Sequence, residues 1–291
     1  MSILYDSVGL PAPVLRGILH VANAYDAGDC DYSVSDLLKP PQVRVLASRH
    51  GEDIVLDAAD LMYQTIGSNV HAMLAHAGVT DGTGPPVNCL RQHPRGGLTT
   101  GRGRVRWTGD PYALSLDGWI LEKRLFATLN GARLSGCPDA YDANTGTLWD
   151  WKTTSVWSYV FGKDEWAQQL AAYDWLGTQN GRPPAKARKI LGIWRDWSKN
   201  RTASADYPAK QVSIVDYSAP ALDVYEPWLK ARVRLHQQAD QAADLGDPLP
   251  ECSLKDRWKN NQRCTHYCAG ADFCDQARKL GIPVTTTQKE S

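Results

Sequence analysis

The strongest constraint on the fold is a run of strand-like segments between residues 119 and 154, separated by turn signals. The segment WILEKRLFATL ends at Asn130-Gly131, a dipeptide typical of two-residue hairpin turns. ARLSGCPDAYD follows, a second turn is expected at residues 143–146, and TLWDWKTT comes next. These three segments predict a three-stranded antiparallel meander, so the chain must fold around a β-sheet.

Helix signals lie on both sides of these strands. Residues 53–77 have apolar side chains at helical spacing, namely those of Leu61, Ile66, Val70 and Leu74, which predicts an amphipathic helix. A short helix in SVSDLLKPP is stopped by two prolines. Further helices are expected over residues 11–25, 164–179 (capped by Asp164) and 220–244, and further strands in KILGIWRDW and QVSIVDYS.

Helices before, within and after a sheet predict an α/β fold, with a mixed central sheet flanked by helices. We expect an N-terminal helical segment over residues 1–50 and a core over residues 51–245. A cysteine-rich tail over residues 246–291 is expected to pack on that core.

Charge and hydropathy exclude two classes of protein. The 291 residues carry 32 basic and 32 acidic side chains, so a uniformly basic nucleic-acid binder is excluded and any such surface must be a local patch. No run of about 18 apolar residues predicts a membrane span, and the N-terminus lacks the layout of a signal peptide. We therefore expect no membrane partner and a cytoplasmic location.

The segment TLWDWKTT places Asp150 and Lys152 two residues apart, so on a strand their side chains leave from the same face. Asp139 is expected on the preceding strand, about 4.8 Å away, where it can point into the same space. Two converging carboxylates suit Mg²⁺ or Mn²⁺. Lys152 would then orient a water molecule or stabilise developing phosphate charge.

Each of these residues also has an ordinary structural interpretation. Asp150 and Lys152 can form a salt bridge on a half-exposed strand. Gln169 and Tyr173 are four apart and share one helix face, where Tyr173 can belong to the core. His71 can be a satisfied interior histidine. Glu122 opens the strand before Asp139 and is a candidate for a further acid in the site, but it is expected to be a surface or packing residue.

Taken in order, these motifs resemble the RecB-type exonuclease branch of the PD-(D/E)XK nucleases, which includes phage-encoded and CRISPR-associated enzymes. The motifs are Gly67-x-x-x-His71, Gly136-x-x-Asp139, Asp150-x-Lys152 and Gln169-x-x-x-Tyr173. The resemblance covers about residues 60–180. It implies a restriction-endonuclease-like core and metal-dependent cleavage of DNA.

The resemblance also implies a role for each motif residue. His71, Asp139 and Asp150 would bind Mg²⁺ or Mn²⁺, and Lys152 would be the catalytic lysine. Gln169 and Tyr173 would touch DNA or brace the catalytic strand.

Four cysteines, Cys252, Cys264, Cys268 and Cys274, lie close together in the tail. Such spacing in a cytosolic chain indicates soft-metal ligation. The resemblance implies a [4Fe–4S] cluster bound by a C-terminal trio and one further cysteine. Zn²⁺ would suit four thiolates equally well. Cys30 matches the usual upstream position of the fourth ligand, but Cys252 is preferred because it lies in the same segment, whereas Cys89 and Cys137 are expected to be unligated.

DNA contacts are expected from an arginine-rich segment, residues 85–107, which includes Arg102 and Arg104 and contains no acidic residue. A solvated flexible hairpin is the alternative interpretation. Aromatic side chains near the catalytic strand, Trp157, Tyr159 and Trp166, are candidates for stacking on unpaired bases, and the sequence does not choose among them.

The expected function is therefore a Mg²⁺- or Mn²⁺-dependent exonuclease acting on DNA ends or single strands. The resemblance implies a role in phage or mobile-element recombination or replication, in the host cytoplasm, with a recombinase or single-strand-binding protein as a candidate partner. A structure-selective endonuclease with the same site is one alternative. The other is a non-catalytic, metal-stapled module that binds nucleic acid.

Overall fold

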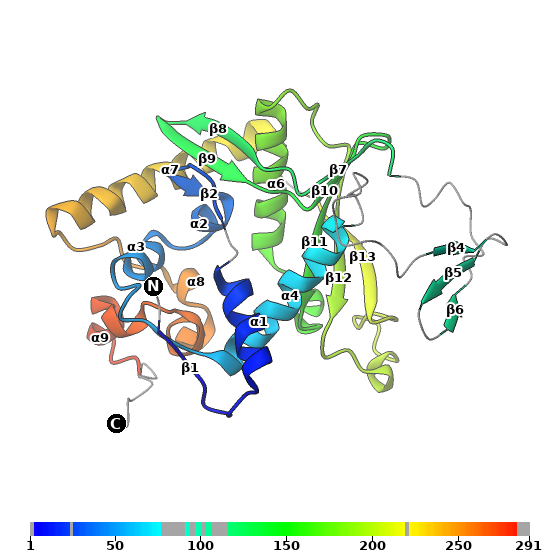
Figure 1. Cartoon of the computed structure of the whole chain (residues 1–291). Coiled ribbons are helices and arrows are strands. Elements are labelled where there is room, and N and C mark those ends of the chain that lie inside the picture. The colour runs from blue at the N-terminus through cyan, green and yellow to red at the C-terminus, as the bar shows by residue number, and fades with distance from the viewer. Residues whose placement is uncertain are drawn as a thin grey trace.

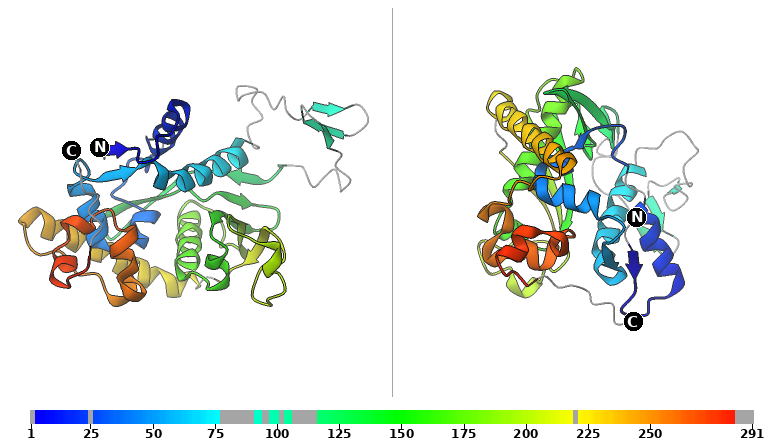
Figure 2. Two further views of the ribbon diagram at one scale, coloured as in Figure 1. Left: turned by 90° about the horizontal axis from the view of Figure 1, so that it is seen from below. Right: turned by 90° about the vertical axis from the view of Figure 1, so that its left-hand side faces the viewer.

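The computed structural model describes residues 3–23, 26–76, 91–93, 97–100, 103–105, 116–218 and 221–283. A central mixed sheet lies between two layers of helices (Figures 1 and 2). Helices α4 and α1 lie on one side of it, and α6 and α7 lie on the other. The α/β class expected from the sequence is confirmed.

The central sheet has five strands in the order β13-β12-β11-β10-β7. Strand β11 is antiparallel to β10 on one side and parallel to β12 on the other. The bounds are β7 (Trp119–Leu121), β10 (Ala140–Asp142), β11 (Thr147–Thr154), β12 (Ala187–Trp194) and β13 (Val212–Asp216).

Helix α6 (Asp164–Gln179) makes the crossover that parallel strands require between β11 and β12. Its Asp174 is fully buried and accepts hydrogen bonds from Arg182 Nη2 at 2.6 Å and from Arg188 Nη2. Arg182 lies between the helix and β12, and Arg188 lies in β12. The buried carboxylate therefore ties the end of the crossover to the sheet. Residue 164 begins the helix as expected, but the N-cap is Lys163, and Asp164 instead pairs with Lys255 at 2.9 Å.

The predicted three-stranded meander is wrong in one respect, because its first two segments are each divided between two sheets. The first breaks after Leu121, where Glu122 has a φ of 45°. Its second half pairs in a separate three-stranded sheet of order β2-β9-β8, in which β2 lies parallel to β9. The hairpin turn at Asn130-Gly131 joins β8 to β9 as predicted, with positive φ at both residues. The bounds are β2 (Tyr32–Ser33), β8 (Leu125–Leu129) and β9 (Ala132–Gly136).

The N-terminal helices are α1 (Ala12–Asn23), α2 (Val34–Leu38), α3 (Pro41–Arg49) and α4 (Ala58–His76). Pro40 and Pro41 end α2 as expected, but Pro41 also begins α3, since its fixed φ suits the first helical position. Helix α4 begins later than predicted because β3 (Val55–Asp57) precedes it and pairs in parallel with β1 (Ile3–Tyr5).

The predicted helix over residues 220–244 is α7 (Leu222–Leu245), and it packs against α3 and α6. The tail contains α8 (Leu254–Arg257) and α9 (Asp275–Lys279), joined by short helical turns. A further small sheet consists of β4 (Arg91–His93), β5 (Gly97–Thr100) and β6 (Gly103–Val105).

The hydrophobic core lies between α6 and the two sheets and includes Leu148, Leu170, Ile190 and Trp194. Helix α4 contributes less to it than its pattern predicted, because Ile66 is 41% exposed. Among the described residues, no helix combines the length and the apolar run that a membrane span requires.

Candidate functional site

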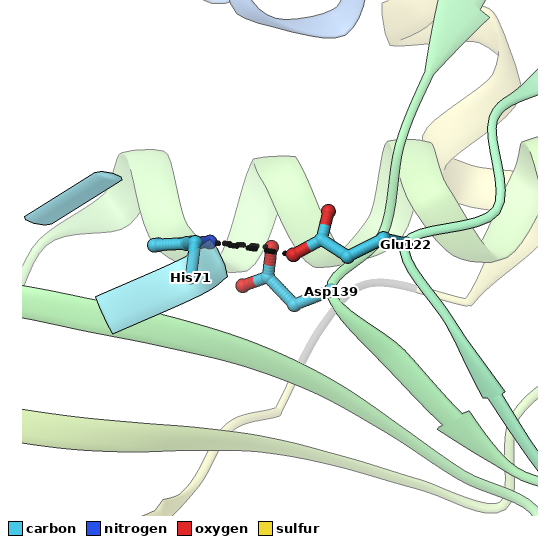
Figure 3. A group of neighbouring side chains, drawn as sticks. All are labelled: His71, Glu122 and Asp139. Carbon is cyan, nitrogen blue, oxygen red and sulfur yellow. Dashed lines mark ion pairs between the residues drawn. The ribbon is translucent and has the colours of Figure 1, made fainter. Parts of the chain in front are cut away.

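Three side chains with metal-ligand atoms meet at the edge of the central sheet, where α4 passes over it (Figure 3). His71 Nδ1 lies 3.1 Å from Asp139 Oδ1 and 3.7 Å from Glu122 Oε1. One ligand atom from each residue lies within 4.8 Å of the other two. Asp139 is buried, and the other two are about one-third exposed, so the group faces solvent on one side only.

The pairing of β7 with β10 explains how Glu122 reaches this group. Leu121 lies opposite Ala140, so Glu122 comes next to Asp139, and its N–H donates to the Asp139 carbonyl at 3.0 Å. Asp139 lies in the connection before β10 rather than on a middle strand, which corrects the expectation. The Asp139 carboxylate also accepts a hydrogen bond from the Trp151 N–H, which fixes it against β11.

A second group forms a chain of contacts from β11 to α6. Lys152 Nζ lies 2.6 Å from Asp150 Oδ2 and donates to Gln169 Oε1 at 2.9 Å. Gln169 Nε2 in turn donates to the Tyr173 hydroxyl at 2.9 Å. Asp150 is 1% exposed, so its pair with Lys152 is buried rather than a surface salt bridge. The four residues expected near the catalytic strand are therefore in contact.

Burial and charge change the proton affinities of both groups. Hydrogen bonds to Asp139 and then Glu122 raise the pKa of His71 to about 10. Burial raises the pKa of Asp150 to about 6, although the Lys152 ammonium opposes the shift. Burial also raises the pKa of Tyr173 well above its usual value, and the Asp150 and Asp139 charges add to this effect. A cation bound beside these carboxylates would offset their repulsion.

The first group opens into a cleft of about 660 Å³ whose lining includes Gln64, Ser68, Arg124 and Tyr173. His71, Glu122 and Asp139 all line this cleft. Cys137 lines it too, and its thiol donates to Glu122 Oε2 at 3.6 Å. The sequence suggested a small buried residue on a strand, but Cys137 is half-buried in the connection between β9 and β10. The cleft gives a ligand access to the acidic group from solvent.

The group that the structure assembles differs from the ligand set expected from the sequence. One imidazole nitrogen and two carboxylates form a ligand set that suits Mn²⁺. The carboxylate oxygens alone also suit Mg²⁺. Glu122, expected to be a surface or packing residue, is one of the three, whereas Asp150 lies beside them in contact with Lys152. The only signal for Glu122 was an acid next to a strand segment, since its approach depends on the β7–β10 register.

The tail cysteines line a separate pocket, which among the described residues shares no lining residue with this cleft. Cys252, Cys264, Cys268 and Cys274 all line it, together with Leu46 of α3 and Ala277 of α9. Burial raises the pKa of Cys252 to about 12, and the neighbouring Asp256 and Cys268 charges add to the shift. Burial also raises the pKa of the Cys264 and Cys268 thiols.

The remaining cysteines and arginines have different positions. Cys30 does not line the cysteine pocket. Its thiol instead accepts a hydrogen bond from Ser135 Oγ at 3.2 Å and donates one to the Ala27 carbonyl. Cys89 and Arg102 lie outside the described residues. Arg104 belongs to strand β6, and its side chain lies outside the described part of the chain.

Comparison with known proteins finds a similar fold among solved structures but no matching family. No family model and no curated protein matches the chain. One solved structure, described as the crystal structure of SSO0001, has a TM-score of 0.51 and 13% sequence identity to it. The likeness covers 90% of this chain and 94% of that one. The TM-score and coverage show a similar fold over nearly the whole length of both chains, and at 13% identity the likeness concerns the fold alone.

Proposed function

We propose that this chain is a Mg²⁺- or Mn²⁺-dependent nuclease with a restriction-endonuclease-like core, which hydrolyses phosphodiester bonds at DNA ends or in single strands. The main support is the convergence of His71, Glu122 and Asp139 with the contacting pair Asp150 and Lys152. We also propose a role in phage or mobile-element recombination or replication, which rests on the resemblance of the motifs alone. Acids and an imidazole at one cleft, with a lysine–carboxylate pair on the adjoining strand, suit metal-assisted phosphoryl transfer better than an isolated surface salt bridge does.

The residues of this chain have distinct tasks in such a reaction. His71, Glu122 and Asp139 would hold the cation, with Asp150 adjacent to them. A bound Mg²⁺ or Mn²⁺ supplies Lewis-acid stabilisation of charge that develops on the phosphate. Lys152 Nζ can donate a hydrogen bond to a water or to a phosphoryl oxygen, and Gln169 and Tyr173 fix its direction.

We also propose that the cysteine pocket binds a [4Fe–4S] cluster, with Zn²⁺ as the alternative. Four thiolates around one zinc ion would lie about 3.8 Å apart. Among the described residues, no three of these thiols lie within 4.8 Å of one another. The wider spacing favours the larger group. Its role would be structural, because the pocket joins the tail to α3.

The nuclease proposal is tested with linear and circular DNA, single- and double-stranded, in Mg²⁺, Mn²⁺ or EDTA. Asp150→Ala and Lys152→Ala are compared with Asp216→Ala and Lys189→Ala. The latter two remove an ion pair of 3.3 Å between strands of the same sheet. We expect metal-dependent loss of linear DNA that only the first two changes abolish.

Other results would lead to other conclusions. Cleavage of circular DNA that the same two changes abolish would favour the endonuclease. No cleavage by anaerobically purified protein with its metal intact would contradict the proposal and favour a binding module. Equal loss in the control pair would show that general damage to the sheet, rather than this site, is measured.

A further inference from the structure

Two aromatic side chains lie exposed just after the strand that carries Asp150 and Lys152. Trp157 and Phe161, here called the aromatic platform, are 40% and 80% exposed. They are four residues apart on and directly after α5 (Trp157–Val160), and their rings stack at 5.7 Å with an interplanar angle of 20°. The two other candidates from the sequence, Tyr159 and Trp166, are half-buried and buried. Exposed aromatic surface of this size needs a reason.

The aromatic platform is held rigidly. Tyr207 is buried and contacts the Trp157 ring edge-on at 6.3 Å. Asp196, which follows β12, accepts from the Val156 N–H at 2.6 Å and from Ser155 Oγ at 2.7 Å. The start of α5 is therefore tied to the end of the neighbouring strand, and little conformational entropy remains to be lost when a ligand binds.

Two arginines lie over aromatic rings in this region. The Arg201 guanidinium lies 5.2 Å from the Trp157 ring centre, and Arg195 lies 4.0 Å from that of Tyr63. Among the described residues, neither arginine lies within 4.0 Å of a carboxylate. Arg195 does interact electrostatically with the neighbouring Asp196, whose carboxylate already accepts hydrogen bonds from Val156 and Ser155. Tyr63 is 61% exposed. The surface thus combines flat apolar faces with two guanidinium groups, of which Arg201 is the one without such a carboxylate neighbour in the described part of the chain.

The aromatic platform adjoins both elements of the candidate site. Strand β11 ends at Thr154, two residues after Lys152, and Thr154 Oγ1 lies 3.2 Å from Ser158 Oγ in α5. Tyr63 lies on α4, the helix that carries His71. Eight residues separate these two, which corresponds to about 12 Å along the helix. A chain-like ligand in the cleft would therefore pass close to this surface.

We propose that the aromatic platform binds unpaired bases of a single-stranded nucleic acid, while Arg201 and Arg195 contact its phosphates. This proposal rests on the proposed function for the choice of a nucleic acid as ligand. Base–aromatic stacking is tolerant of sequence and requires a base with a free face, which a paired duplex does not offer along its length. The exposed outer face of Phe161 provides that contact, and the adjacent cations match the charge of the backbone.

The experiment compares a short labelled oligothymidine with an abasic oligonucleotide of the same length, which has the same charge and no bases. Binding to the full-length, anaerobically purified Asp150→Ala protein is measured by fluorescence anisotropy. The platform double variant, Trp157→Ala with Phe161→Ala, is made in that background. The matched control is Ile214→Ala, which removes a side chain of 60% exposure from β13.

We expect the double variant to weaken oligothymidine binding about tenfold or more and to leave abasic binding unchanged, while Ile214→Ala changes neither. Trp157→Phe with Phe161→Tyr should restore most of the affinity. Equal affinity of the parent for both oligonucleotides, or no loss in the double variant, would overturn the proposal. A loss of both kinds of binding with a lowered melting temperature would mean that the double variant is damaged. Phe161→Ala alone, at an exposed position, then decides: a loss of oligothymidine binding only supports the proposal, and unchanged binding overturns it.

The readout is independent of catalysis. Base-dependent binding without any cleavage by the unmodified protein would keep the aromatic platform and reject the nuclease. Cleavage by the unmodified protein without base-dependent binding would do the reverse.

Discussion

The cleft and the cysteine pocket both gather side chains that can bind a metal, but they draw them from the sequence in different ways. The cleft brings together residues from α4 and two connections, separated by long stretches of chain, with the Asp150–Lys152 pair of β11 beside them, and its metal-ligand atoms are oxygen and nitrogen. The pocket takes its four thiols from one short segment, Cys252 to Cys274. The first arrangement is open and holds unlike charges in contact, whereas the second is enclosed between the tail and α3. We infer that the first suits a reaction and the second suits cross-linking of the fold.

The largest expected effect separates chemistry from folding. Asp150→Asn keeps the shape of the side chain but removes its charge, and we expect cleavage to fall on the order of 10²- to 10³-fold. The melting temperature should fall much less than the rate, because Lys152 loses its ion-pair partner but keeps its hydrogen bond to Gln169, and the buried Asp150 charge no longer has to be desolvated. Rates on linear DNA together with thermal melting check this, with Asp216→Asn as the control. A large drop in melting temperature would mean that Asp150 mainly supports the fold.

The next largest effect is expected in the cysteine pocket, where a substitution should lower stability. Cys268→Ser removes one of four thiols, so we expect loss of bound iron or zinc and a fall of about 5 °C or more in melting temperature. Metal analysis and visible absorbance of anaerobically purified protein measure it. Cys30→Ser should keep its metal, because Cys30 lies apart from the pocket. Metal loss in Cys30→Ser with retention in Cys252→Ser would assign the fourth ligand upstream instead.

A smaller change tests whether Glu122 belongs to the cleft site. Glu122→Gln removes a charge 3.7 Å from His71, so we expect the Mg²⁺ or Mn²⁺ concentration for half-maximal cleavage to rise about tenfold. Metal titrations of the rate measure this. The control is Glu226→Gln on α7, whose carboxylate contacts Lys230 and Trp175. An unchanged metal requirement would exclude Glu122 as a ligand.

The smallest expected effect concerns α3, which forms one wall of the pocket. His236 of α7 is fully buried and accepts from Arg44 Nε of α3 at 3.0 Å. Burial, and then the Arg232 and Arg44 charges, lower its pKa from 6.5 to about 4. Above pH 6.5 the histidine is neutral in both states. As pH falls from 6.5 towards 4, only the unfolded chain takes up the proton, so stability is lost.

We expect this loss to be about 1 to 2 kcal/mol between pH 7 and pH 5. Denaturant unfolding at several pH values measures it. His236→Gln should show a shallower dependence in that window, and His266→Gln, at an exposed position, should keep the slope of the parent. Equal slopes in parent and His236→Gln would show that His236 does not cause it.

The local sequence pattern correctly predicted those elements that depend on neighbouring residues alone. Helix α6 has the predicted bounds of residues 164–179, and its buried residues include Trp166, Leu170 and Tyr173. The pairing of Asp150 with Lys152 and the shared face of Gln169 and Tyr173 were expected from their spacing, and the resemblance placed the second pair beside the catalytic strand. Two features depended on distant pairing instead. The division of the meander requires β2 to pair with β9, and the approach of Glu122 requires the register of Leu121 with Ala140.

The parallel pairing of β11 with β12 has a consequence for the order of events during synthesis. Strand β11 can form a hairpin with β10 as soon as both have left the ribosome, because their connection is short. Its other edge stays unpaired until α6 and then β12 have emerged, and such non-local pairing is slow. Lys152 gains Gln169 as a partner only once α6 packs on β11. A nascent chain therefore carries both members of the Asp150–Lys152 pair well before it can hold the lysine in place.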